Sequence, residues 1–161
     1  MGKEIERKFL INEAEWNNLE KPTGKHLRQG YLLSDPNKTI RVRITDDGAW
    51  MTIKGKSVGA TRLEYEYEIP IADANELLNN FAESELEKMR YNIHYERKIW
   101  EVDVFFGDNH GLIVAEIELQ SENEHFKKPI WVTEEVTTDA RYYNSNLTRY
   151  PFKLWENNVH K

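Results

Sequence analysis

Pairs of like-charged residues, spaced two apart, recur along this chain. They are Glu4 with Glu6, Arg41 with Arg43, Lys54 with Lys56, Glu64 with Glu66, Lys88 with Arg90, and Glu116 with Glu118. Arginine and lysine hold phosphoryl oxygens, whereas carboxylates hold hard divalent cations. Cysteine is absent and the five histidines have no ligand spacing, so oxygen atoms are the ligands on offer. The pairs predict a site for a polyanion that carries Mg²⁺, with Mn²⁺ as a substitute.

A β-strand is the element that would present such pairs, because residues two apart in a strand point to the same face, roughly 6.5 to 7 Å apart. In the segment 39–45, Arg41 and Arg43 alternate with Ile40, Val42 and Ile44. The same alternation occurs in segments 4–10, 49–56, 61–69, 87–93, 99–105 and 112–119.

In each segment the apolar side chains occupy alternate positions, which we call the apolar parity, and the charged side chains occupy the other positions, the charged parity. The apolar parity shows that each strand buries one face, but it does not say which face points inward. A sheet with one face in water produces the same alternation, although its polar face normally mixes both signs of charge. A closed barrel with the charged parity inward would let acidic and basic strands face one another across a wet lumen. The apolar parity, including Tyr65 and Tyr67, would then pack outward under helices. We therefore predict an antiparallel β-barrel with a charged interior and helices outside, in the α+β class.

Capping residues mark short helices between the strands. Asn12, with Glu15 three residues later, predicts a helix through residue 19, and Asp73 is expected to cap a second over 72–86. Ser121 with Glu124 predicts a short third helix that ends before Pro129. Thr138 or Asp139 is expected to cap a last helix. The tail 144–161 would either cover one end of the barrel or pack on its outside.

Composition restricts the class of protein. The 161 residues, 39% of them hydrophobic, are expected to form one domain over 1–161. The absence of cysteine, of a membrane-length apolar run and of a signal peptide predicts a cytoplasmic protein with no membrane partner. A net charge of -6 argues against nucleic acid as a partner. The sequence is compatible with a monomer or a homodimer.

The opening segment EIERKFL resembles the ExExK signature of the CYTH superfamily, the triphosphate tunnel metalloenzymes. The resemblance continues in order through RQGYL (28–32), IRVR (40–43), TIKGK (52–56), RLEYEYEI (62–69), EKMRY (87–91), EVDVF (101–105), GLIVAEIEL (111–119) and EEVTTDARYYNSNL (134–147). It implies a closed tunnel of eight antiparallel strands. The superfamily includes inorganic, thiamine and RNA triphosphatases and class IV adenylyl cyclases.

The resemblance also implies roles for individual residues. Metal binding falls to Glu4, Glu6, Glu116, Glu118, Glu64 and Glu66. Phosphate binding falls to Arg41, Arg43, Lys54, Lys88, Arg90 and Lys8. Catalytic roles fall to Lys8 with its partner Tyr31, and to Asp103. Residues of the same parity that match the family less closely are Lys56, Arg62, Glu68, Lys98 and Glu101.

The short chain and the RQGYL tyrosine resemble the bacterial inorganic triphosphatases, which split triphosphate into pyrophosphate and phosphate with a metal ion. Three alternatives stay open: a class IV adenylyl cyclase, another triphosphate hydrolase such as a thiamine triphosphatase, and a receptor that binds polyphosphate or nucleotide without turnover. Clustered carboxylates repel one another and raise some of their pKa values. An alkaline optimum of metal binding and activity is therefore expected.

Overall fold

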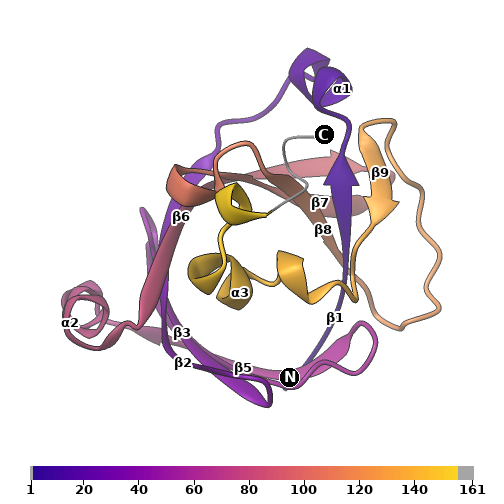
Figure 1. Ribbon diagram of the computed structural model, residues 1–161. Coiled ribbons are helices and arrows are strands. Elements are labelled where there is room, and N and C mark those ends of the chain that lie inside the picture. The colour runs from indigo at the N-terminus through magenta and orange to yellow at the C-terminus, as the bar shows by residue number, and fades with distance from the viewer. Residues whose placement is uncertain (1, 156–161) are drawn as a thin grey trace.

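The computed structural model describes residues 2–155, in which eight antiparallel strands close into a barrel (Figure 1). The strands are β1 (Lys3–Ile11), β2 (Lys25–Asp35), β3 (Lys38–Thr45), β4 (Gly48–Gly55), β5 (Thr61–Ile69), β6 (Ser84–Tyr95), β7 (Lys98–Phe105) and β8 (Ile113–Glu118). Their order around the barrel is β5-β4-β3-β2-β6-β7-β8-β1, and pairing of β1 with β5 completes the circle. The predicted eight-stranded barrel is confirmed.

The first strand closes the barrel by pairing with different neighbours along its length. Its beginning pairs with β5, with Glu4 opposite Arg62, and its middle pairs with β8, with Lys8 opposite Glu116. Its far end pairs with β9 (Val132–Glu135), an extra strand that the sequence pattern did not predict. The offset between the β5 and β8 pairings is the stagger that a closed barrel requires.

The first helix, α1 (Glu13–Asn18), covers β1, β7 and β8 from outside. Asn12 caps it as predicted, since its Oδ1 accepts a hydrogen bond of 2.9 Å from the backbone N–H of Glu15. Trp16 packs edge-to-face on Trp131 in the same core as Trp100. The apolar parity of these strands therefore faces outward and is buried by this cover.

The second helix, α2 (Ile71–Phe81), lies on the outer face of β2, β3 and β4. Ala74 and Leu78 pack against Val42 and Ala49. The predicted cap, Asp73, lies inside the first turn instead, because the helix already begins after Pro70. On β5, Tyr65 and Tyr67 are 48% and 59% exposed, so the expected packing of both side chains is wrong.

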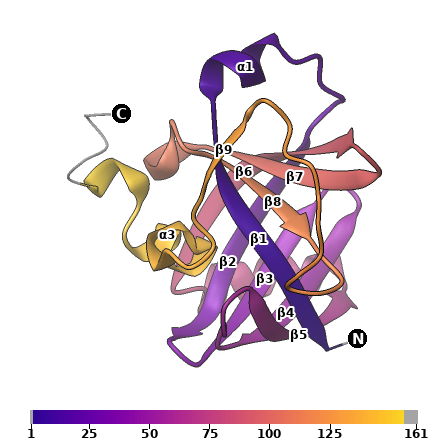
Figure 2. The ribbon, with the colours of Figure 1, turned by 90° about the vertical axis from the view of Figure 1, so that its right-hand side faces the viewer.

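The third helix, α3 (Asn144–Arg149), lies across one end of the barrel (Figures 1 and 2). It follows a 3-10 turn over Ala140–Tyr142, which Asp139 caps through the N–H of Arg141. Leu147 anchors α3 in a core shared with the ends of β6, β7 and β8. Up to residue 155, the tail thus covers a barrel end; residues 156–161 lie outside the described part.

The expected helix at 121–126 is absent from the described structure, which has turns and irregular chain there. The Glu124 carboxylate instead accepts a hydrogen bond from the backbone N–H of Gln120 and pairs with Lys98 of β7. These contacts fix the segment as a loop over the barrel wall. Among the described helices, none has the length and apolar character needed to cross a membrane.

Candidate active site

The lumen contains a cavity of about 170 Å³ that is lined almost entirely by charged and polar side chains. Most of the predicted site residues line it: Glu4, Glu6, Lys8, Tyr31, Arg41, Arg43, Lys54, Glu64, Glu66, Lys88, Arg90, Glu116 and Glu118. The closed sheet turns the charged parity of every contributing strand inward. Among the predicted residues, the structure thus brings together side chains up to 114 positions apart in the sequence, from Glu4 to Glu118.

Three carboxylates meet closely enough to share a cation. Glu6 on β1, Glu101 on β7 and Glu116 on β8 each offer an oxygen, and these oxygens lie within 4.8 Å of one another. Oxygen ligands from several strands suit a hard divalent ion. Glu6 and Glu116 were predicted as metal ligands, but Glu101 was only a weaker candidate. Glu101 shares the charged parity of its strand, and this was the signal that could have identified it as a metal ligand.

Burial and mutual repulsion raise the pKa values of several carboxyl groups in and beside this cluster. Burial raises the pKa of Glu6 well above its usual value, and the nearby carboxylates of Glu116 and Glu4 raise it further. Burial likewise raises the pKa of Glu118 and of Glu101. The expected rise in carboxyl pKa values is therefore present for part of the cluster, and protons compete with cations there.

Glu116 behaves differently because two cations hold its carboxylate. Its oxygens lie 3.3 Å from Nζ of Lys8 and 3.4 Å from Nη2 of Arg90. Burial alone would raise the pKa of Glu116, but the charges of Lys8 and Arg90 lower it to about 2. Glu116 is thus the member of the cluster that is charged at neutral pH.

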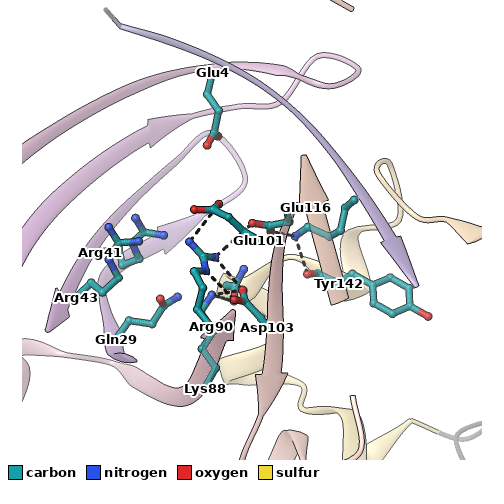
Figure 3. A network of polar contacts seen from close by, with 12 residues as sticks. Glu4, Gln29, Arg41, Arg43, Lys88, Arg90, Glu101, Asp103, Glu116 and Tyr142 are labelled. Carbon is teal, nitrogen blue, oxygen red and sulfur yellow. Dashed lines mark hydrogen bonds and ion pairs between the residues drawn. The ribbon is translucent and has the colours of Figure 1, made fainter. Parts of the chain in front are cut away.

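Asp103 contacts the two basic residues of β6, Lys88 and Arg90 (Figure 3). Its carboxylate accepts hydrogen bonds of 2.7 and 2.9 Å from Arg90 and lies 2.8 Å from Nζ of Lys88. Lys88 and Asp103 are each only 1% exposed, and Asp103 is not among the residues that line the cavity. Asp103 was predicted to act in catalysis, but this geometry suits a residue that positions Lys88 and Arg90.

The same pairing sets the protonation of the two cations. Burial lowers the pKa of Lys88 to about 8, although Asp103 acts in the opposite direction. For Arg90, the attraction of Asp103 outweighs burial and the pKa lies well above its usual value. Lys88 Nζ also donates a hydrogen bond of 3.1 Å to Oδ1 of Asn144, at the start of α3. Lys88 therefore links the lumen to the helix that covers it.

Arg41 and Arg43 of β3 lie across the lumen from Glu101 and Glu116 (Figure 3). Their Nε atoms are buried and have no hydrogen-bond partner in the described structure. Buried donors without partners are costly, and a bound anion would satisfy them. Burial, together with the charge of Arg41, lowers the pKa of Arg43 to about 10.

Glu66 and Thr52 support this arginine pair. The Thr52 hydroxyl accepts a hydrogen bond of 3.0 Å from Arg41 and donates one of 2.6 Å to Glu66. The Glu66 carboxylate also lies 3.6 Å from Nη2 of Arg43. Glu66 was predicted as a metal ligand, but the structure directs it to the arginines and leaves it out of the three-carboxylate cluster.

Lys54 lies between two of the predicted metal ligands. Its Nζ is 3.2 Å from Oε1 of Glu4 and 3.5 Å from Oε2 of Glu64. Arg62, a weaker sequence candidate, also approaches Glu4, at 3.8 Å, and lines the cavity. Glu4 and Glu64 therefore face cations on the β4 and β5 side of the lumen.

The predicted partnership of Lys8 with Tyr31 is not present in the described structure. Lys8 Nζ donates a hydrogen bond of 3.0 Å to the backbone carbonyl of Tyr142 and pairs with Glu116. The Tyr31 hydroxyl accepts a long hydrogen bond of 3.4 Å from Gln29 instead. The chain beyond β9 returns over the barrel end and brings the Tyr142 carbonyl to Lys8, so Lys8 bonds there and to Glu116.

Several site residues were outside the sequence prediction. Tyr143, Asn144 and Ser145 line the cavity from α3 and the residue before it. These three residues are uncharged and do not belong to an alternating strand pattern, so the sequence pattern could not identify them as site residues. Three weaker candidates, Lys56, Glu68 and Lys98, lie outside the cavity lining.

Comparison with known proteins agrees with this geometry. The family model described as "CYTH domain" matches residues 2–149. A protein named inorganic triphosphatase from Acetivibrio thermocellus is 51% identical over 154 residues, covering 95% of this chain and 97% of that protein. Another of that name from Nitrosomonas europaea is 36% identical over 149 residues, covering 89% and 95%. The crystal structure of the inorganic triphosphatase NE1496 matches with a TM-score of 0.63 and 35% identity, covering 92% and 95%.

Proposed function

This chain belongs to the CYTH domain family, and on that premise we propose that its tunnel hydrolyses inorganic triphosphate to pyrophosphate and phosphate with the help of a metal ion. The observation that carries the proposal is the pair of unpartnered Nε donors of Arg41 and Arg43, which face carboxylates across one small cavity. Such a cavity suits a ligand that brings phosphoryl oxygens and a cation together.

We assign the cation to the carboxylate side of the lumen. Glu6, Glu101 and Glu116 would hold it, with Glu4 and Glu118 close by. All of these ligands are oxygen atoms, which favours Mg²⁺, and Mn²⁺ would substitute for it. When bound, the ion supplies neutralisation of phosphoryl charge and a lower pKa for a coordinated water.

Basic side chains of the protein would bind the substrate. Arg41, Arg43 and Arg90, with Lys54 and Lys88, would hold the phosphoryl oxygens in a confined space where each charge counts for more than in water. A water oxygen forms the new bond to the terminal phosphorus while the bridging P–O bond breaks, and pyrophosphate leaves. No side-chain nucleophile is needed for this displacement.

Three predicted residues take supporting roles in this proposal. Asp103 fixes the positions of Lys88 and Arg90, and Lys8 keeps Glu116 charged and in place. Tyr31 lines the cavity and touches Gln29, so it shapes the phosphate side of the lumen. The cytoplasmic location and the choice between monomer and homodimer stay predictions of the sequence.

Phosphate release tests the proposal directly. Inorganic triphosphate and ATP are supplied side by side with Mg²⁺, with Mn²⁺ or with EDTA, and cyclic AMP is monitored in the ATP sample. We expect release from triphosphate in Mg²⁺ or Mn²⁺, none in EDTA, and a loss of at least 100-fold in Glu6→Gln, because removing a ligand charge weakens cation binding. The exposed Lys127→Gln variant serves as the control and should match the wild type.

The other outcomes separate the alternatives. Cyclic AMP together with pyrophosphate from ATP would identify a cyclase. Tight binding of triphosphate in EDTA without turnover in either metal would identify a receptor. The proposed hydrolysis would be refuted by binding of triphosphate without turnover, or by cyclic AMP formation without phosphate release from triphosphate.

A further inference from the structure

A second cavity, of about 310 Å³, lies beside the lumen, between α3 and the tips of two hairpins. We call it the outer cavity. The β2–β3 hairpin tip (34–39), the β4–β5 hairpin tip (55–57) and the segment 140–149 line it. Thr39, Arg62, Tyr143 and Ser145 line both the outer cavity and the lumen. The two cavities are therefore neighbours that share one wall at the end covered by α3.

Basic side chains dominate the outer cavity. Lys38, Lys56, Arg62 and Arg149 line it, against a single carboxylate, Asp35. Asp35 is already engaged in its own turn, where Oδ1 accepts a hydrogen bond of 2.8 Å from the N–H of Asn37. The excess of cations is notable in a chain whose net charge is -6.

The two lysines are free to meet a ligand. Lys38 and Lys56 are exposed, and no ion pair or side-chain hydrogen bond engages either of them in the described structure. Two other exposed lysines, Lys25 and Lys153, have carboxylate partners in Asp47 and Asp108. Unpaired charge in a concave site focuses the field and raises the local concentration of anions.

The two arginines connect this charge to the covering helix and to the lumen. Arg149 donates one hydrogen bond of 3.2 Å to the backbone carbonyl of Ser34, which joins α3 to the β2–β3 hairpin. Its guanidinium keeps further N–H donors for a ligand. Arg62 lies with its guanidinium carbon 6.0 Å from the centre of the Tyr143 ring and its Nε 3.8 Å from Glu4. Arg62 thus stands between the outer cavity and the carboxylates of the lumen.

We propose that the outer cavity is an anion site that binds the phosphoryl oxygens of inorganic triphosphate at the α3 end, before the anion passes into the lumen. The role in turnover rests on the proposed function, whereas binding at the outer cavity does not. Lys38 and Lys56 attract the anion, and Arg62 offers the next contact on its way to Arg41.

A binding experiment tests the site without turnover. Tripolyphosphate is titrated by calorimetry in EDTA at low ionic strength into Arg41→Gln, which weakens the lumen site. We expect binding to persist and to weaken about fivefold or more when Lys38→Gln and Lys56→Gln are added. The matched control adds Lys127→Gln and Lys153→Gln, which remove the same charge from residues that do not line the outer cavity. Equal weakening in both sets, or no effect of the first set, would overturn the proposal.

Kinetics test its role in turnover. In the otherwise unchanged chain, Lys38→Gln with Lys56→Gln should lower kcat/KM for triphosphate about fivefold at low salt, while kcat changes less than twofold. The difference should vanish in about 0.5 M KCl, where screening acts over roughly 4 Å. A parallel fall in kcat, or a difference that persists in salt, would contradict the proposal. If the wild type does not split triphosphate, the proposed function fails, and calorimetry still decides whether the outer site exists.

Discussion

Replacing Asp103 with asparagine removes one negative charge from the barrel wall and keeps the shape of the side chain. Asp103 is the carboxylate that both Lys88 and Arg90 contact, at 2.8 Å and 2.7 Å. Lys88 and Asp103 are each 1% exposed, so water cannot replace the lost partner. Breaking such a buried pair costs about 3 to 5 kcal/mol of unfolding free energy, because one charge is left uncompensated. The melting temperature should fall by roughly 6 to 20 °C.

The Asp103→Asn substitution should also weaken binding of the triphosphate. Asp103 opposes the effect of burial on Lys88, whose pKa is about 8, so its removal lowers that pKa further. Lys88 would then carry less of its positive charge at neutral pH. Losing one charge-assisted hydrogen bond to the substrate costs about 1.5 to 3 kcal/mol, which corresponds to a rise in KM of roughly 10- to 150-fold. Because Asp103 does not line the cavity, Mg²⁺ affinity should change less than about threefold.

Three measurements check this reasoning: urea unfolding followed by tryptophan fluorescence, steady-state kinetics with triphosphate, and calorimetric titration of Mg²⁺. Glu87→Gln is the matched control, because Glu87 is an exposed carboxylate on the same stretch of β6 and its partner is the exposed His26. It should change the unfolding free energy by less than about 0.5 kcal/mol. A stable Asp103→Asn variant, or one that loses Mg²⁺ affinity with KM unaltered, would refute a positioning role.

Two further predictions concern protonation and the support of the arginines. kcat/KM, which reports on the free enzyme, should rise with pH as Glu6 loses the proton that its raised pKa retains, and should fall above about pH 8 as Lys88 becomes neutral. Lys88→Arg should remove the fall, and a flat profile between about pH 6 and 9 would contradict both assignments. Thr52→Val leaves Arg41 and Glu66 without their shared hydroxyl at a fully buried position, so it should lower the unfolding free energy by about 2 kcal/mol and raise KM several-fold. Thr52→Ser should restore both quantities in urea unfolding and kinetics, and failure to restore them would assign the loss to packing of the methyl group.

Local features of the molecule could be predicted because they depend on residues close together in the chain. The period of two places Arg41 beside Arg43 on one face of β3, whatever the rest of the chain does. The cap of α1 by Asn12 is equally local, since it joins residues three apart. The repetition of charged faces in seven segments then favoured a barrel, because such faces neutralise one another when the sheet closes.

Tertiary structure decided which of these charges meet. The stagger of the barrel brings Glu101 to Glu6 and Glu116, and it directs Glu66 to the arginines. Parity cannot predict this, because it places a residue on a face without giving its height along the tunnel.

The covering of one barrel end depends on contacts between distant parts of the chain. Lys8 bonds to the carbonyl of Tyr142, which is 134 residues away, and Arg149 bonds to Ser34, 115 residues away. The sequence by itself therefore determined that the tunnel is charged, since alternation along a strand is a property of the local backbone. Only the closed fold decided that Asp103 pairs with Lys88 and Arg90 without lining the cavity and that α3 covers one end, because these positions follow from the register and packing of the whole barrel.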